Sequence, residues 1–187
     1  LCPNEAEVKA LLSLMLLHDA RRIARFNRKG DFISLEKQDR SLWLVPQIDA
    51  GLLLIENALK MGKVGSYQVQ AAISAIHSEA KTFDQTNWQE ISLLYDELYK
   101  INATPVVQLN RLVAKSYITS VNETLVALNE LEHSFKDYQP FYAVKADFLK
   151  RSGDLIGAEN SYLQAIRLSG NTKEREFLER SLNEMLA

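Results

Sequence analysis

The sequence contains a single cysteine, Cys2, and only three histidines in 187 residues. One thiol can neither form an internal disulfide nor complete a zinc site by itself, and this cysteine usage favours a reducing cytoplasm. The chain has no HExxH pair and no GxSxG elbow, and the Gly62-Lys63-Val64-Gly65-Ser66 segment lacks the upstream glycine and the Lys-Ser/Thr step of a phosphate-binding loop. We therefore expect no catalytic residues, no metal and no cofactor, and a protein that is not an enzyme.

The chain also lacks an excess of either charge and a long apolar run. It has 22 Lys and Arg residues against 24 Asp and Glu residues, a formal net charge of −2. A protein that binds DNA mainly through phosphates would normally carry a strong basic excess. The most apolar stretch near the N-terminus, residues 10–17, is too short to span a bilayer. We expect no direct DNA binding and no membrane association.

Proline and glycine are scarce, with four and seven residues, and most of them fall between segments with apolar residues at helical spacing. The spacing predicts one helix from Pro3 to about Phe26, with one apolar face, and a second over about 44–60. The first face comprises Val8, Leu11, Leu12, Met15 and Leu16, and the second helix directs Ile48, Leu52, Ile55 and Leu59 inward. Only residues 31–35 favour a short extended piece.

From Tyr67 onward the pattern becomes repetitive, and residues 142–170 fit a tetratricopeptide repeat. Its small and large apolar positions, with the glycine of the turn, are Ala146, Leu149, Gly153, Ala158, Tyr162 and Ala165. One repeat period of about 34 residues earlier lie Leu112, Leu128 and Leu131, and another period earlier lie Tyr95 and Leu98. We predict an all-α fold in which tetratricopeptide-like antiparallel helical pairs form a short right-handed solenoid. A helical region, 1–66, packs on the repeats of 67–187 as one continuous domain.

Several strings of the sequence resemble one family in their order and separations. They are LMLLHDARR (14–22), LEKQDRSLW (35–43), YQVQAAI (67–73) with His77 beyond it, NW (87–88), LYD (94–96) and PVVQLNR (105–111). Together they resemble the C-terminal region of the large extracytoplasmic-function (ECF) sigma factors of bacterial RNA polymerase that carry a tetratricopeptide-like extension. The resemblance extends from about Pro3 to the end of the chain.

This resemblance implies a cytoplasmic transcription initiation factor whose N-terminal half binds core polymerase and promoter elements and whose helical extension regulates that activity. Both sigma regions are missing here, because no helix-turn-helix with a basic recognition helix can be found. The chain begins at Leu1 and not at a methionine, so we expect it to be part of a longer protein. The expected function is a regulatory interaction domain whose partners are the sigma regions of the parent chain, core polymerase or a signalling protein. The alternative is a stand-alone tetratricopeptide-like scaffold unrelated to transcription.

A basic cluster is the first candidate interaction site. Arg21, Arg22 and Arg25, followed by Arg28 and Lys29, would contact polymerase, DNA phosphate or an acidic partner. The structural interpretation is a helix C-terminus whose cations complement the helix dipole and pair with acids such as Asp19 or Asp39.

Two further groups have the same ambiguity. The first group, Gln38, Asp39, Arg40 and Trp43, forms a recognition patch or else has structural roles. In the structural interpretation Trp43 covers the core between the first two helices, Asp39 caps a helical turn and Arg40 pairs with an acid. The second group, Asn110 and Arg111, either lines the concave face of the repeats or forms hydrogen bonds at the edge of the core.

Overall fold

The computed structural model describes residues 5–62 and 64–187, and its regular structure is helical. The α-helices are α1 (Ala6–Asp19), α2 (Val45–Leu59), α3 (Ser66–Glu79), α4 (Trp88–Ile101), α5 (Pro105–Lys115), α6 (Val121–Leu131), α7 (Gln139–Ser152), α8 (Leu155–Leu168) and α9 (Thr172–Leu186). Short 3-10 turns are η1 (Arg22–Arg25), η2 (Leu35–Lys37), η3 (Arg40–Leu42) and η4 (Glu132–Ser134). Within these ranges the extended structure is one antiparallel bridge between Phe26 and Phe32. The all-α prediction is confirmed.

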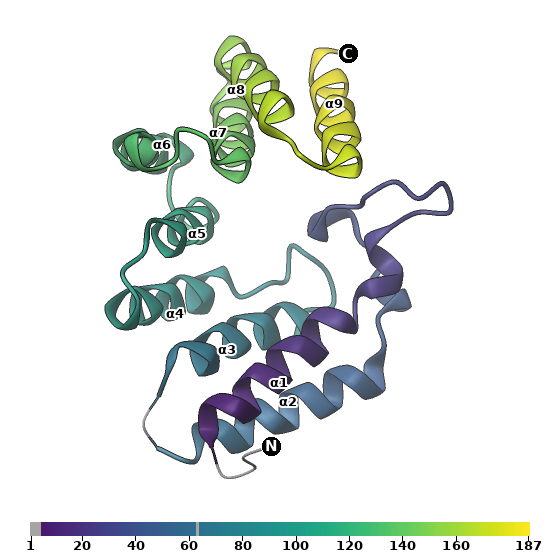
Figure 1. Ribbon diagram of the computed structural model, residues 1–187, viewed down its shortest axis with the longest axis vertical. Helices are drawn as coiled ribbons and strands as arrows, with labels where there is room; N and C mark the ends of the chain where they lie inside the picture. The colour runs from purple at the N-terminus through teal and green to yellow at the C-terminus, as the bar shows by residue number, and fades with distance from the viewer. Residues whose placement is uncertain (1–4, 63) are drawn as a thin grey trace.

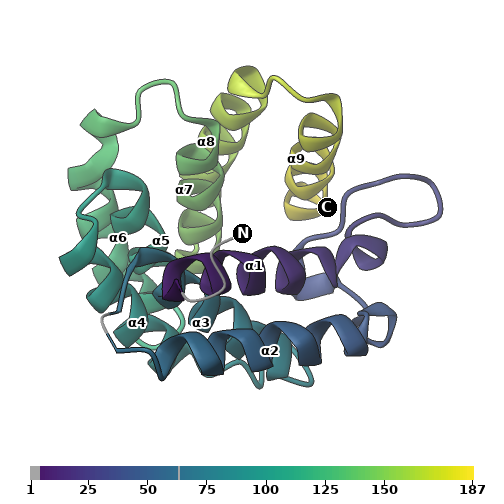
Figure 2. The ribbon, with the colours of Figure 1, turned by 60° about the horizontal axis from the view of Figure 1, so that its bottom comes forward.

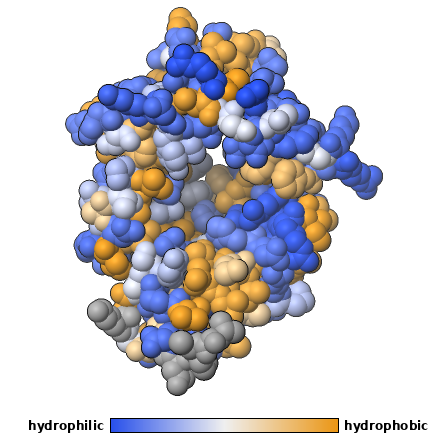
Figure 3. All heavy atoms as spheres, viewed as in Figure 1, coloured by the Kyte–Doolittle hydropathy of each residue, from blue (hydrophilic) through white to orange (hydrophobic). Residues whose placement is uncertain are grey.

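Successive helices pack against one another, and the array curves back toward its own beginning (Figure 1). Helices α1, α2 and α3 lie together at one end, and α4 to α8 continue away from them (Figures 1 and 2). Helix α9 returns to the loop before η2, where Arg180 forms an ion pair with Asp31 at 2.9 Å and the rings of Phe32 and Phe177 meet edge to face at 5.3 Å. Figure 3 shows the hollow that this curvature leaves in the middle of the molecule.

The predicted repeat is confirmed in α7 and α8. Ala146, Ala158 and Ala165 are fully buried, so the two helices cross closely, and the ring of Tyr162 is 7% exposed between α8 and α9. Gly153 ends α7 with a φ of +90°, which glycine adopts without the penalty of a Cβ. The Asp154 carboxylate then caps α8 by accepting a hydrogen bond from the backbone N–H of Gly157 at 2.9 Å.

The earlier repeat positions are also in the core. Leu128 is fully buried, Leu112 is nearly so, and Tyr95 is half-buried in the cluster that joins α3, α4 and α5. Helix α3 contributes to two apolar clusters, since Ala71 packs with α1 and α2 whereas Val69 packs with α4 and α5. The predicted regions 1–66 and 67–187 are therefore joined through a shared helix.

Two predictions for the N-terminal helix are wrong. The α-helix ends at Asp19 instead of near Phe26, and the Ala20 carbonyl accepts a tertiary hydrogen bond from Leu44 N–H at 3.0 Å. The buried face is also the opposite one, formed by Ala10, Ser13 and Leu17. The predicted face is mostly exposed at Val8, Leu11, Leu12 and Met15. Apolar residues surround this helix on both sides, and periodicity alone does not distinguish which side α2 and α3 cover.

The close crossing of α1 and α2 explains Gly51 inside the second helix. The Ser13 hydroxyl donates to the Gly51 carbonyl at 2.7 Å, and a Cβ on Gly51 would lie 2.8 Å from Cγ of the buried Leu17. Gly51→Val is therefore expected to lower the free energy of unfolding by about 1–3 kcal/mol through overpacking. Chemical denaturation measures this, with Gly170→Val as the matched control, because a Cβ on Gly170 meets no atom within 4 Å. Equal stability of the two variants would contradict the close crossing.

Candidate functional site

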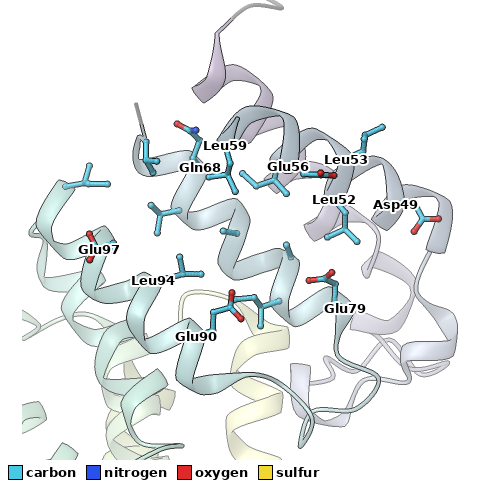
Figure 4. Close-up of a pocket in the computed structure, with 17 residues that line it drawn as sticks. Asp49, Leu52, Leu53, Glu56, Leu59, Gln68, Glu79, Glu90, Leu94 and Glu97 are labelled. Atoms are coloured by element: carbon cyan, nitrogen blue, oxygen red, sulfur yellow. The ribbon is translucent and has the colours of Figure 1, made fainter. Parts of the chain in front are cut away.

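A large concave surface is a groove of about 1020 Å³ with α3 as its floor and α2 and α4 as its walls (Figure 4). The floor of the groove carries the small residues Ala72 and Ala75 of α3, with Val69 and Ile76 beside them. At one end the side-chain amide of the fully buried Gln68 donates to the Ala58 carbonyl at 3.0 Å, which ties α3 to the C-terminal end of α2. The groove is thus built into the helix packing.

Apolar side chains from three elements remain open to solvent in this groove. Leu53 is 60% exposed, and Leu59, Val64 and Ile101 are each more than 40% exposed. Leu52 and Leu94 are half-buried beside them. The prediction that Leu59 points inward is therefore wrong, because its side chain lies at the groove. Ile48 and Ile55 are in the core, as predicted. A continuous apolar surface of this kind is typical of a binding site.

The polar rim of the groove is acidic. Asp49 and Glu56 lie seven residues apart on α2, and Glu90 and Glu97 have the same spacing on α4, so each pair projects from one face of its helix. Glu79 at the end of α3 is the fifth carboxylate (Figure 4). All five are exposed, and none of the described residues that line the groove is basic.

Two of these carboxylates have lysine neighbours outside the groove. Lys60 pairs with Glu56 at 2.6 Å and thereby lowers the pKa of that carboxyl, and Lys100 pairs with Glu97 at 2.6 Å. Both pairs are exposed, and such pairs contribute only about 0–1 kcal/mol. Displacing these lysines would therefore cost little.

The acidic rim has a signal in the sequence that belongs to none of the motifs named above. Acids at seven-residue spacing occur on two helices, at Asp49 and Glu56 of α2 and at Glu90 and Glu97 of α4. Such spacing is ordinary on a solvated helix face. Only the packing of α2 and α4 on either side of α3 shows that the two faces oppose each other.

The basic cluster lies at the C-terminal end of α1, as the structural interpretation predicted. Arg22 pairs with Asp19 at 2.6 Å, and Arg25 donates to the His18 carbonyl at 2.8 Å. Arg21 is different, because its guanidinium lies 5.7 Å from the Trp43 ring centroid and forms no ion pair with any described residue. A contact of these arginines with a partner stays a prediction.

The group of Gln38, Asp39, Arg40 and Trp43 has structural contacts. Trp43 is 5% exposed in the core of α1 and α2, and the Asp39 carboxylate accepts a hydrogen bond from Ser41 N–H at the start of η3. The prediction that Arg40 pairs with an acid is wrong for the described residues. Its guanidinium covers the Trp43 ring at 4.5 Å and donates to the carbonyls of His77 and Ala80 at 2.5 and 2.6 Å. These carbonyls end α3 and attract a cation. Gln38 donates to the Ile33 carbonyl at 3.2 Å.

The residues Asn110 and Arg111 lie in two different environments. Arg111 forms an ion pair with Asp96 and lies 5.6 Å from the Tyr99 ring centroid, which supports hydrogen bonding at the edge of the core. Asn110 is exposed and lines a smaller cavity of about 290 Å³ on the inside of the curve, beside Trp88 and Tyr117. None of the candidate residues predicted from sequence lines the large groove.

Burial of His77 predicts a pH dependence of stability. Burial, together with the charges of Arg21 and Arg40 and with His18, lowers the His77 pKa to about 4. An unfolded histidine has a pKa of about 6.5. Between these values the unfolded chain binds a proton that the folded chain does not, so lowering the pH favours unfolding.

We therefore expect the free energy of unfolding to be constant above about pH 7 and to fall as the pH decreases from about 6.5 toward 4, by about 1–3 kcal/mol for His77. Urea denaturation across this range measures the fall. It should become shallower in His77→Gln and remain unchanged in His133→Gln, since His133 is exposed on η4. Identical profiles for the two variants would contradict the role of His77.

The fold and the groove together define an all-helical protein of packed helical pairs with an acidic-rimmed apolar groove. Residues 1–59 match the sequence profile of DUF6596, a family of unknown function. The whole chain is 36% identical over 187 residues to an uncharacterised protein of Rhizobium meliloti (strain 1021), of which it covers 44%. The chain thus spans less than half the length of this relative. No solved structure matches the chain. In the described residues, no helix has the length and apolar character needed to cross a membrane.

Proposed function

We propose that this chain is the C-terminal regulatory and protein-interaction domain of a bacterial ECF sigma factor, and that its groove holds a basic amphipathic helix. The observation that carries the proposal is the groove, in which an apolar floor on α3 lies between two walls that each carry a pair of carboxylates. Helix-in-groove recognition uses apolar anchors on one face of the bound helix, with oriented polar groups beside them.

The charges of the groove specify its occupant. A helix with Leu or Phe anchors toward Ala72 and Leu94, and with Lys or Arg on its flanks, would meet carboxylates on both walls. Opposite charges across an interface steer association and exclude acidic competitors. The volume of the groove, about 1020 Å³, lies at the upper limit of the range of about 300–1,000 Å³ for small-molecule pockets. A groove of this volume favours a peptide segment.

The link to transcription rests on the ordered strings from LMLLHDARR (14–22) to PVVQLNR (105–111) that resemble the sigma-factor extension. The length of the relative supports a larger parent, because 56% of that protein lies outside the region that this chain matches. In a parent of the sigma type, the DNA-binding regions supply basic helices within the same chain. The proposed occupant is such a helix, and its release from the groove would regulate the parent factor.

Transcription in vitro with core polymerase tests this proposal. The full-length parent, the parent truncated before Leu1, and the isolated chain are compared on the parent's target promoter. The isolated chain is expected neither to bind the promoter specifically nor to support transcription, and truncation is expected to change the transcript level of the parent. Unchanged transcription after truncation would reject the regulatory function and favour a stand-alone scaffold, as would a reading frame without sigma regions upstream.

A further inference from the structure

A second concave site lies on the inside of the curve, where α1, α3 and α4 meet. Its cavity of about 210 Å³ is lined at one end by Arg21, His18 and Ser74, and it adjoins the cavity of about 290 Å³ that contains Asn110. Leu35, His77 and Tyr95 line both. The two volumes together fall within the range of about 300–1,000 Å³ that is typical of small-molecule sites.

The polar groups of the smaller cavity are donors without an acid among them. Arg21 is half-buried and forms no ion pair with the described carboxylates. Burial lowers the pKa of its guanidinium, and the nearby charges of Arg25 and Arg40 also lower it. The His77 Nδ1 atom is buried without a hydrogen-bond partner, and the Tyr95 and Ser74 hydroxyls lie nearby. The His18 imidazole contacts the Ser74 hydroxyl at 3.2 Å. A desolvated guanidinium without a counter-ion is costly unless an anion completes the site.

The adjoining cavity has a different character. Its walls are aromatic, with Trp88 stacked on Tyr117 at 4.0 Å between ring centroids and Phe83 against both rings. Glu36 is its one carboxylate, and it is exposed. This charge would repel an anion from the aromatic end and favours placing the anionic group at Arg21.

We propose that this double cavity binds a small organic oxyanion, whose carboxylate or phosphate group is held by Arg21, His77 and Tyr95 and whose apolar body lies along Trp88 and Tyr117. The planar fork of a guanidinium matches two oxygens of either anion. The Tyr95 side chain, which lines both cavities, and the buried His77 Nδ1 atom, in the tautomer that carries its proton there, supply the remaining donors. The site is separate from the acidic groove on the opposite face of α3, and it does not depend on the function proposed for that groove.

Titrations monitored by NMR of the histidine rings test this proposal at constant ionic strength, with chloride as the reference salt. The probes are acetate, inorganic phosphate, benzoate and phenyl phosphate. We expect saturable shifts at His18 and His77 and none at the exposed His133. Benzoate and phenyl phosphate are expected to bind tighter than acetate and phosphate because their rings add contacts with the aromatic walls. Tighter binding of benzoate than of phenyl phosphate would indicate a carboxylate ligand, and the reverse order would indicate a phosphate ligand.

Arg21→Gln should weaken binding at least about tenfold, as expected for the loss of a charge-assisted bidentate contact. Arg22→Gln is the matched control and should bind like the wild type, since Arg22 pairs with Asp19 on the surface. If Arg21→Gln does not fold, Tyr95→Phe removes one donor and keeps the shape. Shifts that do not saturate, or equal affinities in the wild type, Arg21→Gln and Tyr95→Phe, would overturn the proposal.

Discussion

Replacing Tyr162 by alanine is expected to lower the free energy of unfolding by about 3–5 kcal/mol, because a large aromatic ring is removed from a closely packed site. The ring is 7% exposed and packs with Ala146, Ala165, Leu178 and Leu182, so its loss leaves a cavity at the junction of three helices. An effect of this size is a large part of the total stability of a small domain. Thermal and chemical denaturation measure it.

The neighbouring Leu163 provides the control, since it is 49% exposed on the outer face of α8. Leu163→Ala is expected to change stability by less than about 1 kcal/mol. Ala158→Leu tests the same helix pair by overpacking, with an expected cost of about 1–3 kcal/mol. Wild-type stability in both Tyr162→Ala and Ala158→Leu would show that the repeat core is wrongly described.

Reversing the charge of one groove wall is expected to abolish recognition of a basic helix. Glu90→Lys combined with Glu97→Lys places two cations where the bound helix would present its own, and like charges across an interface cost several kcal/mol. The probe is a synthetic amphipathic helix with leucines on one face and lysines on its flanks. We expect the affinity, measured by calorimetry at low salt, to fall at least about tenfold.

Two further variants show whether the effect comes from the position of the charges. One makes the same change in net charge outside the groove, and the other fills the groove without a change in charge. Glu123→Lys combined with Glu130→Lys makes the same change at the same seven-residue spacing on α6, where both residues are exposed and outside the groove. This control should bind like the wild type. Ala72→Phe fills the floor of the groove without altering charge and should also block the helix. Equal binding by the wild type and both groove variants would place the binding surface elsewhere and remove the basis of the proposed function.

Local sequence determined most of the repeat architecture. Gly153 and Asp154 specify the turn between α7 and α8 through a left-handed glycine and a helix cap, and these effects depend on neighbouring residues alone. The spacing of Ala146, Ala158 and Tyr162 predicted the close crossing of α7 and α8, because small residues are required where two helices approach closely.

The N-terminal region shows where this reasoning failed. Helix α1 has apolar residues on both faces, so its pattern was compatible with burial of Val8 and Met15 or of Ala10 and Leu17. The choice followed from the shape of α2, because Gly51 and Ser13 allow a backbone approach that larger residues would prevent. Arg40 likewise finds its partners at the end of α3, 37 and 40 residues away.

The sequence by itself determined the helical class, the position of the second long helix and the core of the last repeat, because propensity, capping and spacing act within one or two turns. Only the tertiary structure decided which apolar residues are exposed, and it alone placed Asp49 and Glu56 opposite Glu90 and Glu97 across α3. It also brought Arg21 beside His77 and left the guanidinium without an acid. Both sites depend on which helices become neighbours, and packing over the whole chain fixes that arrangement.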